Sequence, residues 1–184
     1  MKSFFSYDPK LLVYGFLIVF FASYGQTFFI SLFNTEIRFY YGLTDGEFGF
    51  VYAISTLFSS FILISFAKLI DHIDLRTYSL IVTVGLLLAC IGMALLINNI
   101  FYLFIIIFML RFFGQGAMTH AGETTMARYF GSNRGKALSV ATLGGMAGVM
   151  FLPYISLNYF TNIEMKQLWF YASISIIVFI PFIF

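Results

Sequence analysis

Long apolar runs separated by short polar breaks are the dominant pattern of this chain. Six runs are close to the ~20 residues that an α-helix needs to cross the hydrocarbon of a membrane. Because an open sheet would leave backbone groups unpaired in lipid, each run is expected to be a helix. The pattern therefore predicts an all-α membrane protein with six transmembrane helices, near residues 11–33, 48–70, 77–97, 100–126, 137–160 and 167–184.

Composition supports a multi-pass membrane protein and narrows the function classes. Hydrophobic residues make up 61% of the chain and charged residues only 10%, whereas about a quarter of a soluble domain is charged. The net charge of +2 is too small to indicate a nucleic-acid partner. The single cysteine, Cys90, excludes an internal disulfide. The first apolar run continues through Phe33, which favours a membrane span over a signal peptide.

Lysine and arginine are unevenly divided between the two sides of the membrane. Basic residues concentrate in cytoplasmic loops, and an N-terminus in the cytoplasm leaves only Arg38 and Lys166 on the opposite side. This asymmetry predicts a protein of the cytoplasmic (inner) membrane with both termini in the cytoplasm. The residues then on the cytoplasmic side are Lys2, Lys10, Lys68, Arg76, Arg128, Arg134 and Lys136.

Two features suggest that the six helices are half of something larger. The sixth run reaches the end of the chain, "IIVFIPFIF", without the basic residue or polar tail that usually anchors a helix at the cytoplasmic face. We therefore expect residues 1–184 to form an N-terminal six-helix bundle and the chain to be a fragment. A shift of 89 residues also aligns the starts of three spans and places Gly25–Gln26 on Gly114–Gln115. Two inverted three-helix repeats of this kind are a transporter device.

The segment "RFFGQGAMTHAGE" places an arginine inside the fourth apolar run. If this span begins at residue 100, Arg111 lies about 16 Å along it, near the middle of the bilayer. Arg111, Gln115, Thr119 and Glu123 are spaced by four and share one helix face. A guanidinium at this depth needs an anion, water or carbonyl groups as partners. It is therefore a candidate binding group for an anionic solute, and the alternative is a structural arginine buried among carbonyls.

Other polar residues complete the candidate site and its surroundings. Gln26 and Thr27, in the first span, could supply hydrogen bonds to the solute together with Gln115. Glu123 lies about 18 Å from Arg111 along the helix, so an ion pair with Arg76 or Arg128 near the interface is expected instead. His120 is a candidate proton site, because imidazole can titrate near neutral pH, although a hydrogen-bonded packing role is the alternative.

Three stretches together resemble the N-terminal six-helix half of a major facilitator superfamily transporter, a twelve-helix carrier. "AKLIDHIDLR" is similar to the family's G-x-L-x-D-R-x-G-R-[RK] loop. It matches this loop at Leu69, Asp71 and Arg76 and differs from it at other positions. The resemblance implies that Asp71 and Arg76 belong to a gating ion-pair network. "RFFGQGA" is similar to the family's R-x-x-x-G-x-G pattern, with glycine at 114 and 116. In that family this arginine is linked to substrate binding and proton coupling.

The third stretch, "ARYFGSNRGKALSVATLGGMAGVMFLP", resembles the branch that includes monocarboxylate and oxalate–formate carriers. Its basic Arg-Gly turn and its glycine-rich span ending at Pro153 carry this likeness, but Val149 follows Gly148, so the Gly-Pro of the family's antiporter signature is absent. The resemblance implies alternating access, with a missing C-terminal six-helix half or a second copy completing the carrier. The glycines of this span are interpreted as sites of close helix packing.

The alternatives to a transporter are a membrane enzyme and a noncatalytic subunit or self-pairing six-helix channel-like unit. No nucleophile with its base, metal cluster or pair of aspartates at depth is evident in the sequence, and neither is a filter-like loop. We therefore expect no catalytic residue, metal or cofactor. The predicted function is secondary active transport of a small organic anion, with proton coupling as an option.

Overall fold

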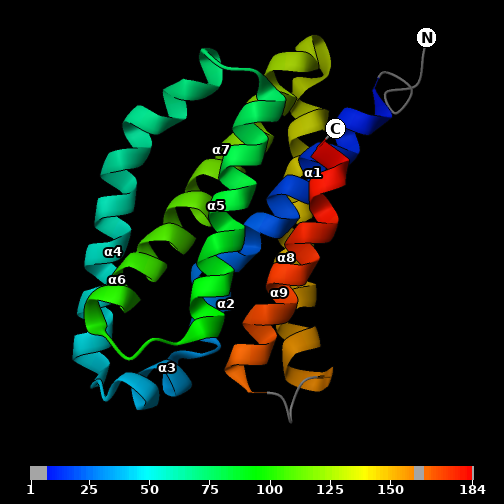
Figure 1. The fold of residues 1–184 in the computed structure, drawn as a ribbon. Coiled ribbons are helices and arrows are strands. Elements are labelled where there is room, and N and C mark those ends of the chain that lie inside the picture. Colours follow the sequence, from blue (N-terminus) through cyan, green and yellow to red (C-terminus); the bar gives the residue numbers. More distant parts are fainter. Residues whose placement is uncertain (1–7, 160–163, 184) are drawn as a thin grey trace.

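A computed structural model describes residues 8–159 and 164–183, and within these ranges the regular structure is entirely helical (Figure 1). The prediction of six membrane-spanning helices is confirmed. Lys2, Phe160 and Phe184, which entered the orientation and span predictions, lie outside the described residues. The observed spans begin and end within a few residues of the predicted ones, except that the fifth begins six residues earlier. They are Pro9–Ser31, Asp45–Asp71, Leu75–Leu95, Ile100–Tyr129, Gly131–Asn158 and Met165–Ile183.

The first span is not one continuous α-helix. Helix α1 (Pro9–Ala22) begins with the carboxylate of Asp8 accepting a hydrogen bond from the Leu11 amide at 3.0 Å. A 3₁₀ turn (Ser23–Gly25) and the extended residue Gln26 interrupt it before α2 (Thr27–Ser31). A separate helix, α3 (Asn34–Tyr41), then leads to the second span. The hydropathy pattern predicted the span but not this break.

The second and third spans begin at side-chain caps. Thr44 and Glu47 form a reciprocal capping box at the start of α4 (Asp45–Phe66), which satisfies amides that have no partner within the helix. The short 3₁₀ helix Ala67–Asp71 continues this span. Asp74 caps α5 (Leu75–Leu95) by accepting from the Thr77 amide at 3.2 Å. These caps fix where each helix starts and therefore its register in the bundle.

The fourth span changes its helical geometry halfway along. It begins as α6 (Ile100–Met109), continues as a nine-residue π-helix (Leu110–Met118) and ends as α7 (Thr119–Tyr129). The wider π turn is rare and is frequently found at functional sites. The fifth span contains α8 (Arg134–Tyr159), with Pro153 inside it, and the sixth contains α9 (Met165–Phe179) followed by a 3₁₀ turn (Ile180–Ile183).

The helix contacts are those expected if a local two-fold axis relates the first three spans to the last three. In this relation the first span corresponds to the fourth, the second to the fifth and the third to the sixth. Helix α1 packs on α8 in the fifth span, and the exchanged pair, α4 with α6, also packs together. Helices α5 and α9 belong to the corresponding third and sixth spans and are in contact. Helix α1 likewise contacts the fourth span, to which the first span corresponds. Successive spans run in opposite directions, so the equivalent spans are inverted (Figure 1). This arrangement matches the predicted pair of inverted three-helix repeats.

The 89-residue shift finds its physical counterpart where the first and fourth spans cross. A Cβ atom built on Gly25 would lie 2.7 Å from the Cα of Gly114, and one built on Gly114 would lie 2.7 Å from the Cα of Gly25. The two glycines therefore lie directly against each other at this crossing. The two backbones can approach this closely only because neither position carries a side chain.

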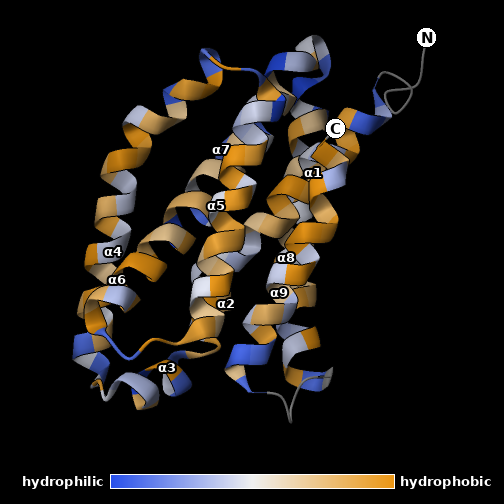
Figure 2. Ribbon diagram, viewed as in Figure 1, coloured by the Kyte–Doolittle hydropathy of each residue, from blue (hydrophilic) through white to orange (hydrophobic). Residues whose placement is uncertain are grey.

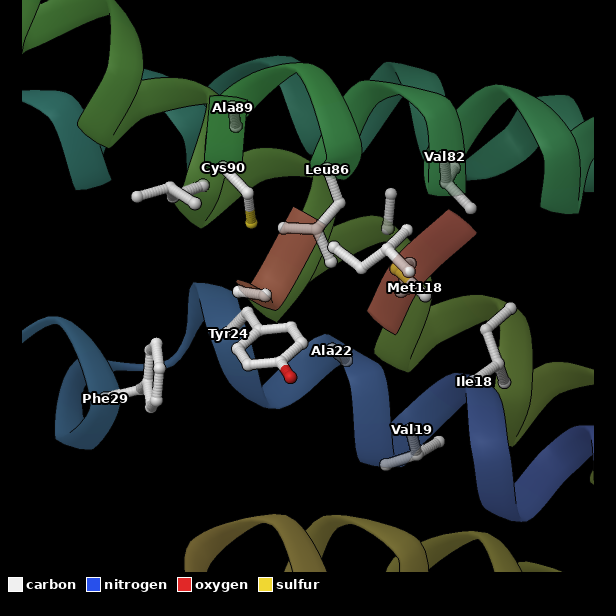
Figure 3. Packing of buried hydrophobic residues seen from close by; sticks show 14 of the residues in the cluster. Ile18, Val19, Ala22, Tyr24, Phe29, Val82, Leu86, Ala89, Cys90 and Met118 are labelled. Carbon is white, nitrogen blue, oxygen red and sulfur yellow. The ribbon is translucent and has the colours of Figure 1, made fainter. Parts of the chain in front are cut away.

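Apolar side chains fill the interior and also cover much of the outside of the bundle. Figure 2, in which the ribbon is coloured by hydropathy, shows apolar residues along the spans. In the interior, Met118 lies among residues of α1 and α5 such as Ile18, Val82 and Leu86 (Figure 3). Gly144 in α8 lies directly against the backbone of Phe16, so the interpretation of the fifth-span glycines as packing residues is confirmed for this position. A lipid environment accounts for the apolar exterior, because lipid tails need no polar cover.

Candidate functional site

Arg111 lies in the π-helix of the fourth span and is almost fully buried, with 6% of its surface exposed. Its Nη1 donates to the carbonyl of Gly25 at 3.3 Å and to the hydroxyl of Thr27 at 3.0 Å. Its Nε donates to the hydroxyl of Thr56 at 3.2 Å, and the guanidinium carbon lies 5.3 Å from the centre of the Tyr52 ring. Every hydrogen-bond acceptor is neutral, and no carboxylate of the described residues forms an ion pair with Arg111.

The break in the first span supplies two of these acceptors. Gln26 has extended backbone angles (φ −79°, ψ 152°), and the amides of Phe29 and Ile30 both donate to its carbonyl. In a continuous α-helix the Phe29 amide would instead donate to Gly25. The Gly25 carbonyl is therefore left for Arg111, and Thr27, the first residue of α2, accepts from both Arg111 and Tyr52.

A groove of about 260 Å³ runs beside Arg111, between α4 and the second half of the fourth span. All four residues of the predicted stripe line it, together with three hydroxyl residues of α4. Two polar atoms in its wall, Oε1 of Gln115 and Oγ1 of Thr119, are buried and have no hydrogen-bond partner among the described residues. The lining residues are Thr56, Ser59, Ser60, Leu63, Arg111, Gln115, Gly116, Thr119, His120 and Glu123.

The other two predicted solute ligands have different positions. Thr27 belongs to the site through its hydrogen bond to Arg111, although it does not line the groove. Gln26 is half-buried and also lies outside the groove lining. Its visible role is to break the helix. The structure thus brings Arg111 and Gln115 together in one groove and leaves Gln26 beside it.

Helix α4 contributes residues to the site that were not predicted from the sequence. Tyr52 packs against the guanidinium, and Thr56 accepts its hydrogen bond. Ser59 and Ser60 donate to the Thr56 carbonyl at 2.9 Å each and line the groove. A signal was present, because residues 52, 56, 59 and 60 are polar at helical spacing within a mostly apolar span.

His120 and Glu123 form the end of the groove away from Arg111. His120 lies near the hydroxyl of Thr124, with 3.3 Å from Nδ1 to Oγ1. Glu123 is exposed and, within the described residues, has no ion-pair partner. The expected ion pair of Glu123 with Arg76 or Arg128 is not formed within the described residues, because Arg128 pairs with a different carboxylate.

That carboxylate is Asp71, at the end of the second span. Arg128 pairs with Asp71 and also donates to the carbonyl of Ile70 at 3.4 Å. The pair joins the second span to the fourth at the face where the basic residues gather. Arg76, which matches another position of the same loop motif, is exposed and forms no ion pair within the described ranges. No group of three His, Cys, Asp or Glu residues in the described part of the chain could hold a metal ion.

Replacing Asp71 with asparagine is expected to lower the free energy of unfolding by less than about 1 kcal/mol, the usual range for exposed pairs. The side chains of Arg128 and Asp71 are 44% and 58% exposed, so water screens their attraction. A double-mutant cycle with Arg128→Gln, measured by unfolding in detergent, isolates the pairwise contribution. A coupling above roughly 2 kcal/mol would show that the pair is far stronger than its exposure implies.

Comparison with known proteins agrees with this architecture. The chain has no match among curated proteins or among solved structures. A family model described as Major Facilitator Superfamily matches residues 15–184, which is most of the chain and includes all of the site described above. Its members are membrane transporters rather than enzymes. With six spans and a family match of this extent, the chain belongs to the Major Facilitator Superfamily.

Proposed function

We propose that this chain forms one six-helix half of a secondary active transporter that carries a small organic anion by alternating access. The observation that carries the proposal is the positive charge of Arg111, which is held by three neutral acceptors beside a polar groove. A charge at this depth costs several kcal/mol unless it meets an anion, water or carbonyl groups, and only one of the three acceptors here is a carbonyl. A solute carboxylate that binds at the groove would supply the missing negative charge, and Gln115 would add a hydrogen bond.

The groove also supports the proposal of a facing bundle. Ser60 and Glu123 line the groove and are exposed, so it opens at the surface of the six helices. Hydrocarbon cannot solvate such a surface. A second six-helix bundle, either a C-terminal half or a second copy of the chain, would close it and would create a site between two bundles. In this arrangement both termini lie in the cytoplasm, at the inner membrane.

Proton coupling is the second part of the proposal. His120 and Glu123 line the same groove as Arg111, and imidazole is the side chain that ordinarily changes charge near neutral pH. A proton held at His120 would make the groove more attractive to an anion.

Asp71 and Arg128, which join the second and fourth spans, are proposed to act as a gate at the cytoplasmic end, together with Arg76.

Uptake by proteoliposomes that carry the full-length protein tests the proposal. The likeness to monocarboxylate and oxalate–formate carriers selects lactate, formate and oxalate as probes. Lactamide and oxamide are matched controls of similar size without charge. We expect saturable uptake of at least one carboxylate, no comparable uptake of its amide, and a pH change in the vesicles that depends on the carboxylate.

Each contrary outcome removes a defined part of the proposal. Equal uptake of an acid and its amide would contradict recognition of an anion. Uptake that rises linearly with concentration, without saturation or counterflow, would indicate a channel-like unit instead of a carrier. Saturable carboxylate uptake without any accompanying pH change would remove proton coupling and leave anion transport in place.

A further inference from the structure

A second and larger cavity lies apart from the groove beside Arg111. It has a volume of about 620 Å³ and lies between the first turns of α1 and α5 and the 3₁₀ turn Ile180–Ile183. None of its lining residues lines the groove beside Arg111. Figure 1 shows this end of the bundle, where the beginning of α1 and the described C-terminal end lie close together. The cavity is therefore a separate site.

Two basic side chains from different helices line this cavity. Lys10 belongs to the first turn of α1 and Arg76 to the first turn of α5, and both residues are exposed. Neither forms an ion pair within the described part of the chain. The acidic residue in the lining is Asp8, whose carboxylate accepts a hydrogen bond from the Leu11 amide. The cavity wall therefore carries a net positive charge.

The remaining walls of the cavity are largely apolar. Leu11, Val13 and Leu75 contribute aliphatic surface, and Phe182 adds an aromatic ring. At its inner end, Tyr14 and Ser79 are joined by a hydrogen bond of 2.6 Å, so their hydroxyls are already paired. The basic groups belong to the first residues of two membrane spans. They consequently lie at headgroup depth, with the apolar walls adjacent to the hydrocarbon.

We propose that this cavity binds the phosphate headgroup of an anionic phospholipid, with an acyl chain along the apolar walls. Lysine offers a compact charge and arginine a fork of donors, a combination that suits phosphate oxygens. Basic pockets between transmembrane helices are known to hold such headgroups. A free phosphate would use the same cations but not the apolar walls. A lipid that contacts both cations would tie the first turn of α1 to the first turn of α5.

The test uses the full-length protein in nanodiscs of phosphatidylcholine that contain a minority of phosphatidylglycerol. Native mass spectrometry after release counts the phosphatidylglycerol molecules that each protein retains. The double variant Lys10→Gln/Arg76→Gln is expected to lower affinity for this lipid about thirtyfold, because each basic group near an anionic headgroup contributes about fivefold. The matched control, Arg134→Gln/Lys136→Gln, removes two exposed charges that do not line the cavity.

The outcomes distinguish a lipid site from general charge attraction and from a site for a soluble anion. Retention by the control and by the conservative variant Lys10→Arg/Arg76→Lys, together with loss in Lys10→Gln/Arg76→Gln, supports the proposal. Equal loss in the control would show that general surface charge attracts the lipid and would overturn the site. Displacement of the lipid by inorganic phosphate would show a site for a soluble anion and would overturn the lipid assignment. Unchanged retention in Lys10→Gln/Arg76→Gln would also overturn the proposal.

Discussion

Replacing Arg111 with glutamine is expected to weaken binding of the transported anion by roughly 10- to 100-fold, because a hydrogen bond to a charged group contributes about 1.5–3 kcal/mol. Glutamine keeps an amide donor but loses the positive charge beside the groove. Lysine at this position should give an intermediate loss, because it keeps the charge but cannot reproduce the forked donors. The measurement is the concentration dependence of carboxylate uptake in proteoliposomes with the full-length protein.

Thr56→Val provides a matched control for this prediction. It removes one acceptor of the guanidinium while it keeps the charge in place, so we expect a change in uptake of less than about tenfold. The yield of folded protein and its unfolding midpoint should be recorded for each variant, because Arg111 also holds the first span to the fourth. If folded Arg111→Gln protein takes up the anion as the native protein does, Arg111 is a structural arginine and the proposed site is wrong.

Replacing Gly25 with valine is expected to destabilise the protein by about 3 kcal/mol or more. Added volume in a well-packed interior typically costs about 1–3 kcal/mol, and here the new side chain would meet backbone atoms, which cannot move aside as a side chain can. A Cβ atom at this position lies 2.7 Å from the Cα of Gly114 and 2.8 Å from the amide nitrogen of Gln115. Thermal unfolding in detergent and the yield of monodisperse protein measure the effect.

Gly49→Val is the matched control for this substitution. Gly49 lies on α4, and a Cβ atom built there would have no neighbour within 4 Å. We expect a shift of less than about 1 kcal/mol, because the residue is exposed and lies in a helix. The reciprocal variant Gly114→Val should behave like Gly25→Val. Equal stability of Gly25→Val and Gly49→Val would show that the first and fourth spans do not touch as described.

The six spans could be predicted because length and hydropathy are properties of single segments. The stripe from Arg111 to Glu123 could be predicted for a similar reason, since residues spaced by four share one helix face. The break at Gln26 and the π-helix could not, because both depend on how the first span crosses the fourth. A hydropathy pattern records which segments are apolar, but it does not record where a helix must bend around its neighbour.

Contacts between residues that lie far apart in the chain also could not be predicted from the sequence. The Arg128–Asp71 pair joins residues separated by 57 positions, so its assignment requires the packing of two spans. Thr56 and Ser59 were overlooked for a different reason. Hydroxyl residues in membrane helices commonly bond to carbonyls of their own helix, as Ser59 does. Only the position of Thr56 beside the guanidinium distinguishes it from those ordinary cases.

The way Arg111 is held leaves part of its guanidinium available. The group carries five N–H donors, and its three hydrogen bonds to the protein use Nε and Nη1. None of these three bonds uses Nη2, which lies with the rest of the guanidinium beside the Tyr52 ring. An arriving carboxylate can therefore engage Nη2 while the first and fourth spans stay connected. Most of the conformational entropy of this long side chain has already been lost on folding, so the loss that usually opposes ligand binding is smaller here.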